Sequence, residues 1–67
     1  KHKLEELNKQ YGFNFVASEE YDTLSGFITS NIGRIPKNQE LITLNEYEFK
    51  ILKINDNFIE EVILYVL

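Results

Sequence analysis

Apolar side chains recur at helical spacing in the middle of the chain, between residues 21 and 36. They occupy positions i, i+3, i+4 and i+8, at Leu24, Phe27, Ile28 and Ile32. This spacing places all four side chains on one helical face. Asp22 or Thr23 can accept a hydrogen bond from the free backbone amides of the first turn, so either is a candidate N-cap. The pattern predicts one short, capped helix.

The end of this helix is also marked in the sequence. Gly33 can adopt the left-handed conformation that closes a helix, and Pro36 pushes Ile35 out of the helical region. Gly26 lies inside the helix, where glycine costs about 1 kcal/mol relative to alanine, so we expect a close contact with another backbone or a ring there. Arg34 follows the helix, where a cation can meet the unpaired carbonyl groups; binding of a partner is the alternative role.

A second short helix is predicted before it, over residues 1–12. Its apolar positions recur at i, i+3 and i+7, at Leu4, Leu7 and Tyr11. Gly12 stands where a helix C-cap is expected. The following segment has no helical period, because Phe13 and Phe15 alternate with a polar residue. We expect an extended connection there that presses two rings onto the core.

The second half of the chain alternates apolar and polar residues, as strands do. The clearest alternation is Tyr47, Glu48, Phe49, Lys50 and Ile51. Residues 40–44 and 58–67 are the other two strand candidates. Residues 45–46 and 55–57 are the expected hairpin turns, since Asn and Asp tolerate a positive φ. The parity of the apolar positions changes at Leu52 and again near residues 60–61, which predicts bulges or, at Leu52, a strand covered on both faces.

The predicted fold is therefore α+β, with two short helices packed on one face of a small antiparallel sheet. The three strands form a C-terminal meander with an exposed edge. We expect that edge to be covered by a strand from sequence that precedes this chain, or by a second copy that forms a homodimer through the sheet edge. Residues 1–67 are interpreted as a single domain truncated at its N-terminus, because the chain begins with Lys rather than Met.

Composition narrows the functional classes. Apolar residues make up 43% of the sequence, enough for one compact core. There is no Cys, so disulfides and thiolate metal sites are excluded. A net charge of -4 argues against binding to nucleic acid, which needs clustered Lys and Arg. No apolar run approaches the roughly 20 residues of a membrane span, so no direct membrane insertion is expected.

No catalytic or metal-binding constellation stands out. The single histidine, His2, lies near the terminus without a positioned partner, and a solvated side chain is the favoured interpretation. The acidic residues are dispersed, and the Ser and Thr hydroxyls have no base nearby in the sequence. The glycine spacing matches neither GxGxxG nor a P-loop. The residues themselves therefore nominate no catalytic or metal-binding side chain and favour a chain that is not an enzyme.

Two motifs carry a family resemblance. The run from Tyr21 to Gly26 and the run from Gly33 to Pro36 closely resemble the CorC/HlyC-type transporter-associated domain, whose central helix opens with D-T-L-x-G and ends in G-R-I-P. The matching positions, with a structural or docking role, are Asp22, Thr23, Leu24, Gly26, Gly33, Arg34, Ile35 and Pro36. The chain departs from the family at Ser25 and Gln39, where Gly is usual.

The resemblance implies a cytoplasmic, C-terminal module of a bacterial inner-membrane protein, described in this family as a hemolysin or a magnesium and cobalt efflux protein. Such a module accompanies a membrane region and a pair of CBS domains, and it would modulate ion transport by docking on them without a cofactor. The fold is also similar to part of certain flavin-binding domains. Binding of flavin or an adenine nucleotide is therefore the alternative function, and a passive structural appendage is a third.

Overall fold

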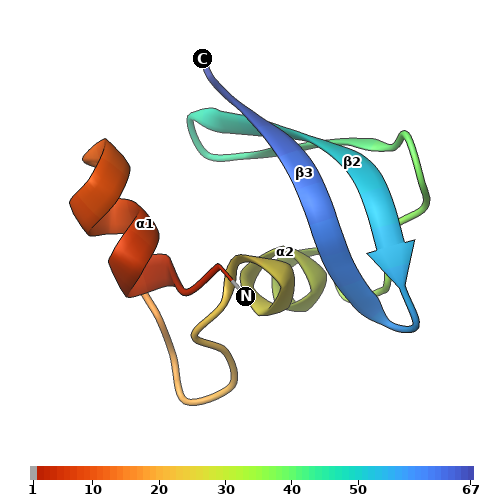
Figure 1. The fold of residues 1–67 in the computed structure, drawn as a ribbon, viewed down its shortest axis with the longest axis horizontal. Helices are drawn as coiled ribbons and strands as arrows, with labels where there is room; N and C mark the ends of the chain where they lie inside the picture. The colour runs from red at the N-terminus through yellow and green to blue at the C-terminus, as the bar shows by residue number, and fades with distance from the viewer. Residues whose placement is uncertain (1) are drawn as a thin grey trace. The chain divides into compact units, whose positions relative to one another are not determined.

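The computed structural model describes residues 2–67 and contains two helices and one sheet (Figure 1). In chain order these are α1 (Leu4–Tyr11), α2 (Leu24–Ile32), β1 (Leu41–Leu44), β2 (Tyr47–Asn55) and β3 (Phe58–Val66). The predicted class, a small α+β domain with a three-stranded antiparallel sheet, is confirmed. The chain divides after Gly33 into a helical unit and a sheet unit. The packing of both helices on one face of the sheet stays a prediction.

Helix α1 begins at Leu4, so residues 2 and 3 of the predicted helix lie outside it, while residue 1 lies outside the described residues; the helix ends as predicted. Gly12 adopts the left-handed conformation, with φ 74°, and its N–H donates to the carbonyl of Asn8. Of the residues at the predicted apolar positions, Leu4 is buried, whereas Tyr11 is 57% exposed. The Tyr11 ring instead stacks on Phe13 in the following loop, with ring centroids 5.5 Å apart.

The loop between the helices is held both by a backbone bridge between Ser18 and Tyr21 and by side chains. The Asn8 side chain binds the backbone of Phe15 twice, donating to its carbonyl at 2.7 Å and accepting from its N–H at 3.0 Å. Phe15 is thereby fixed and buried, with its ring centroid 5.2 Å from that of Phe27 in α2. Phe13 is half-buried. The predicted inward-facing rings are therefore present, with Phe15 as the more deeply placed of the two.

Neither of the two helices in residues 2–67 has the length and apolar character that crossing a bilayer requires.

The sheet is an antiparallel meander in the order β1-β2-β3. The central strand pairs with both neighbours, so that Phe49 lies opposite Ile42 on β1 and Leu64 on β3. Alternate residues of β2 are buried, beginning with Tyr47. The alternation read from the sequence therefore gave the correct strand and the correct buried face.

The second hairpin contains both predicted bulges. The register runs Ile51↔Val62, Lys53↔Glu61, Ile54↔Ile59 and Asn55↔Phe58. Leu52 on β2 and Glu60 on β3 consequently have no residue opposite them. An unopposed residue of this kind bends a strand and increases its twist. The change in apolar parity in the sequence is explained by these two positions.

Both hairpins turn through two residues; the first turn is as predicted, and the second is one residue shorter than predicted because Asn55 ends β2. Asn45 has φ 56° and Asp56 has φ 57°, and each is the first of the two connecting residues. Tight hairpins require a positive φ at that position because it matches the twist of the flanking strands. Asn and Asp tolerate this conformation better than other non-glycine residues do.

A third positive φ occurs at Gln39, in the turn that precedes β1. The N–H of Glu40 donates to the carbonyl of Lys37 at 3.1 Å, which makes Gln39 the third residue of a β-turn. Its φ is 69°, the value that type II turns assign to glycine at this position. The turn is tied to β2, because the Gln39 N–H donates to the Ile51 carbonyl at 2.6 Å. This backbone conformation explains why glycine would suit the position better.

We expect Gln39→Gly to stabilise the chain by up to about 1 kcal/mol, since relief of the left-handed penalty exceeds the entropy cost of glycine. Urea unfolding followed by circular dichroism measures the change. Asn38→Gly is the matched control, because Asn38 lies in the same turn without a positive φ and should lose stability. A loss of stability in Gln39→Gly that equals the loss in the control would contradict the expectation.

Candidate functional site

The first motif joins the starts of the two helices. The N–H of Leu4 donates to the carbonyl of Asp22 at 2.9 Å, and the N–H of Leu24 donates to the carbonyl of His2 at 2.8 Å. These two bonds flank an antiparallel bridge between Lys3 and Thr23. The backbone of the motif is therefore used to hold α1 beside the start of α2, as Figure 1 shows.

Of the two candidate caps, Thr23 is the N-cap of α2. Its Oγ1 accepts a hydrogen bond from the backbone N–H of Gly26 at 3.2 Å. Asp22 contributes its backbone carbonyl to Leu4 instead. Leu24, the first helical residue, is buried. The three residues thus cap α2, connect it to α1 and fill the core.

Gly26 allows close approach of the preceding segment to the helix. A Cβ atom at this position would lie 2.7 Å from the Cβ of Tyr21, closer than two such carbons can come without a shift of one segment. Tyr21 is half-buried, and its ring meets Phe27 edge-on with centroids 5.8 Å apart. The expected close contact at Gly26 is therefore confirmed, and Tyr21 is the residue that makes it.

The second motif ends α2 and begins the segment before the sheet. Gly33 has φ 74°, and its N–H donates to the carbonyl of Thr29 at 2.9 Å. Ile35 is 41% exposed, whereas Pro36 is buried. Gly33 is thus the predicted left-handed helix end, and the two residues after Arg34 differ in their exposure.

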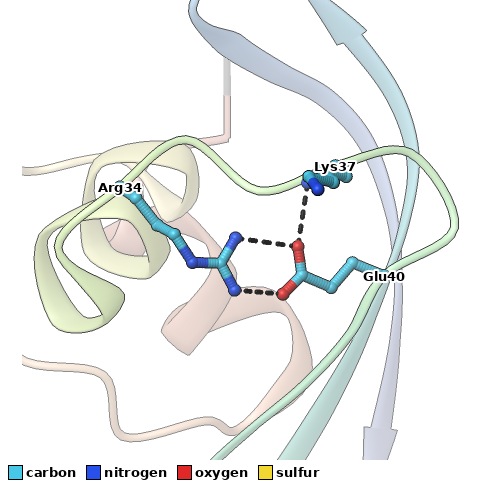
Figure 2. A network of polar contacts seen from close by, with 3 residues as sticks. All are labelled: Arg34, Lys37 and Glu40. Carbon is cyan, nitrogen blue, oxygen red and sulfur yellow. Dashed lines mark hydrogen bonds and ion pairs between the residues drawn. The ribbon is translucent and has the colours of Figure 1, made fainter.

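Arg34 forms a bidentate ion pair with Glu40 across the turn (Figure 2). Its Nη1 donates to Glu40 Oε1 at 2.9 Å, and Nη2 binds Oε2. The backbone N–H of Lys37 donates to the same Oε1, also at 2.9 Å. One carboxylate therefore accepts hydrogen bonds from both sides of the turn. The guanidinium, expected near the carbonyl groups at the helix end, is directed to this carboxylate.

This ion pair borders an open depression of about 420 Å³. The lining residues are Arg34, Lys37, Asn38, Gln39 and Glu40. A bidentate pair fixes both position and orientation of the groups it joins, more than a single contact does. Both oxygens of Glu40 are occupied by donors from the same turn. These hydrogen bonds therefore have a structural role, because they hold the turn that leads into β1.

The ion pair shifts the titration of both partners. Hydrogen bonding from Arg34, followed by the Lys37 amide, lowers the pKa of Glu40 from 4.5 to about 2. The same hydrogen bond raises the pKa of Arg34. Because the pKa of Glu40 is lowered on folding, the ionised carboxylate stabilises the fold above pH 4.5, and this contribution is lost as the pH falls from about 4.5 to about 2.

We expect Arg34→Gln to raise the pKa of Glu40 toward its usual value, because the strongest donor is removed. A carboxyl ¹³C NMR titration measures the midpoint directly. Lys37→Ala is the matched control, since it retains the backbone N–H that binds Glu40. Identical midpoints in the wild-type protein and Arg34→Gln would contradict the assignment of this pair.

Sequence reasoning did not identify Glu40 as the partner of Arg34. The signal was present, since Pro36 and the polar residues 37–39 mark a turn that brings residues 34 and 40 together. Within residues 2–67, no group of three or more His, Asp or Glu side chains is arranged to hold a metal ion.

A comparison with protein families places the two motifs in a known domain. The CorC_HlyC family, described as a transporter associated domain, matches the chain over residues 1–67. The chain belongs to this family. Domains of the CorC_HlyC family are generally non-catalytic accessory domains of transporters.

Two relatives support the same assignment. The chain is 40% identical over 48 residues to the magnesium and cobalt efflux protein CorC of Buchnera aphidicola, covering 72% of this chain and 17% of that protein. It is 30% identical over 60 residues to hemolysin C of Brachyspira hyodysenteriae, covering 90% and 22%, respectively. The CorC_HlyC chain thus spans about a fifth of the length of these relatives, which contain further sequence outside the domain.

A solved structure shares the fold. The transporter associated domain of a Xylella fastidiosa hemolysin, solved in complex with Mg²⁺ and Mn²⁺, superposes with a TM-score of 0.77 at 28% identity. The superposition covers 100% of this chain and 80% of that one.

Proposed function

We propose that this CorC_HlyC domain is a non-catalytic regulatory module of a bacterial membrane ion transporter of the hemolysin or magnesium and cobalt efflux type. The observation that carries the proposal is the family match over the full 67 residues. The relatives, an efflux protein and a hemolysin, indicate the class of parent protein.

The roles of the motif residues support a docking mechanism. Thr23 caps a helix, Gly26 permits close packing, and Arg34 binds Glu40 in the same turn. These residues build the scaffold, so the contacts with a partner fall to exposed surfaces. A module that packs on a neighbouring domain biases the transporter only as far as it binds one state better than another.

The proposed partners are the other domains of the same parent, namely a pair of CBS domains and the membrane region. The proposed location is the cytoplasmic face of the inner membrane. A strand that precedes α1 in the parent, or the edge of a second copy, would cover the exposed edge of the sheet. Flavin or adenine-nucleotide binding stays the alternative prediction from the family resemblance.

The proposal is tested in the parent transporter, by comparing ion efflux with and without the domain at equal protein abundance. Deletion should change the dependence of efflux on ion concentration while the transporter continues to conduct. Efflux that is unchanged at every ion concentration would contradict regulation and assign the domain a passive structural role. A milder variant, Arg34→Gln, removes one ion pair and keeps the rest of the domain, so it serves as a control for loss of transporter abundance.

A further inference from the structure

Two rows of residues lie on the face of the sheet opposite to Phe49, here called the outer face. Residues directly opposite each other on neighbouring strands project to the same side of a sheet. One row is Leu41, Lys50 and Ile63, and the other is Thr43, Glu48 and Tyr65. Each row therefore places a charged residue of β2 between two residues of the outer strands.

The outer face exposes apolar side chains that a sheet facing only water does not need. Leu41 is 59% exposed, Ile63 is 38% exposed and Tyr65 is 44% exposed, whereas Phe49 and Ile51 on the opposite side are fully buried. An antiparallel sheet with one face in water normally alternates apolar and polar residues. Exposed apolar side chains that are neighbours across strands indicate an interaction surface.

The centre of the outer face carries one charge of each sign. Glu48 and Lys50 are two residues apart on β2, which separates them by about 7 Å along the strand. The ion pairs in the described part of the chain are Arg34–Glu40 and Lys53–Glu60, so neither central charge is neutralised there. Both are half-buried between their cross-strand neighbours. Their positions on the face are therefore well defined.

A surface of this kind is complementary to itself. When two identical patches meet about a two-fold axis, each residue i contacts j and each j contacts i. A two-fold axis that lies in the plane of contact, perpendicular to β2 and midway between the two central charges, places Glu48 of one copy over Lys50 of the other, twice. The exposed apolar residues of the outer strands then surround the two ion pairs.

We propose that a second copy of this chain docks face to face on the outer face, with reciprocal contacts between Glu48 and Lys50. This arrangement uses the face of the sheet rather than its edge, and so differs from the edge-to-edge pairing expected from the sequence. The inference goes beyond the proposed regulatory function and does not depend on it, because it concerns association of the chain with itself.

Charge exchange tests the proposal by sedimentation equilibrium of the 67-residue chain. We expect the wild type to dimerise weakly, with a dissociation constant on the order of 0.1–1 mM for so small a face. Glu48→Lys and Lys50→Glu should each weaken self-association about tenfold or more, because both reciprocal contacts become repulsive. Equimolar mixing of the two variants, or combining both changes in one chain, should restore association.

Matched controls separate position from net charge. Glu19→Lys and Lys9→Glu make the same changes in net charge at exposed sites in the helical unit and should leave association unchanged. Circular dichroism melting of each variant checks that the fold is retained. Restored association in the mixture and in the double exchange supports the proposal even if one single variant is less stable.

Several results would overturn the inference. A wild-type chain that stays monomeric at 1 mM, or single exchanges that dimerise as well as the wild type, would exclude the face-to-face dimer. A dimer whose NMR dilution shifts map to the backbone amides along an outer strand edge would assign the second copy to the edge instead. A monomer whose outer face becomes protected only in the parent protein would assign the face to another domain.

Discussion

Replacing Phe49 by alanine is expected to unfold most of the chain. Phe49 is fully buried in the central strand, opposite Ile42 and Leu64, with the Tyr47 ring centroid 6.4 Å from its own. Removing a buried phenylalanine ring costs about 3–5 kcal/mol, because both the transfer free energy and the contacts around the new cavity are lost. A single core in a domain of this size supplies roughly 3–5 kcal/mol in total. Loss of far-ultraviolet circular dichroism and of NMR dispersion measures the effect.

Two variants keep this expectation testable. Phe49→Leu retains most of the volume and should cost less than about 1.5 kcal/mol. Thr43→Ala, on the exposed side of β1, should change stability by no more than about 0.5 kcal/mol. A folded Phe49→Ala chain with nearly wild-type stability would show that the described core is wrong at this position.

The second large effect is expected for Gly26→Ala. Alanine normally improves a helix by about 1 kcal/mol relative to glycine. Here the added Cβ would meet the Cβ of Tyr21 at 2.7 Å, so the segment before α2 must move away. Overpacking of this kind costs about 1–3 kcal/mol, and the close approach involves Cβ carbons that no rotamer change can displace. We expect a net loss of up to roughly 2 kcal/mol in urea unfolding, against the gain that helix propensity alone predicts.

A double-mutant cycle identifies the contact. Tyr21→Gly removes the Cβ that Gly26→Ala would meet, so the cost of the alanine should fall or change sign in that background. Tyr21→Ala is the control, because it retains the Cβ and should not rescue. Equal costs of Gly26→Ala in all three backgrounds would exclude Tyr21 as the source of the strain.

Structural features that depend on residues close together in the sequence were predicted correctly. The end of α2 at Gly33, the turns at Asn45 and Asp56, and the bulges near Leu52 and Glu60 all follow from local backbone chemistry, and the structure confirms them. Each depends on a few neighbouring residues whose allowed conformations are narrow.

Features that depend on contacts between segments distant in the sequence were not predicted. Periodicity placed Tyr11 on the apolar face of its helix, but stacking on Phe13 holds the ring at an exposed position. It also left Gly26 without a named neighbour and Arg34 without its carboxylate. A residue pattern gives the face of a helix or strand, whereas the partner depends on the path of the intervening loop.

The two bulges of the β2–β3 hairpin have a consequence for changes in chain length. The register is the same on the two sides of the bulges, at Ile51↔Val62 and at Ile54↔Ile59, because one extra residue in each strand compensates for the other. Loss of either residue alone would shift the pairing by one and reverse the side to which the neighbouring apolar residues project. Loss of both would preserve it. Relatives of this domain should therefore gain or lose residues at these two sites together, as a linked pair in their alignment.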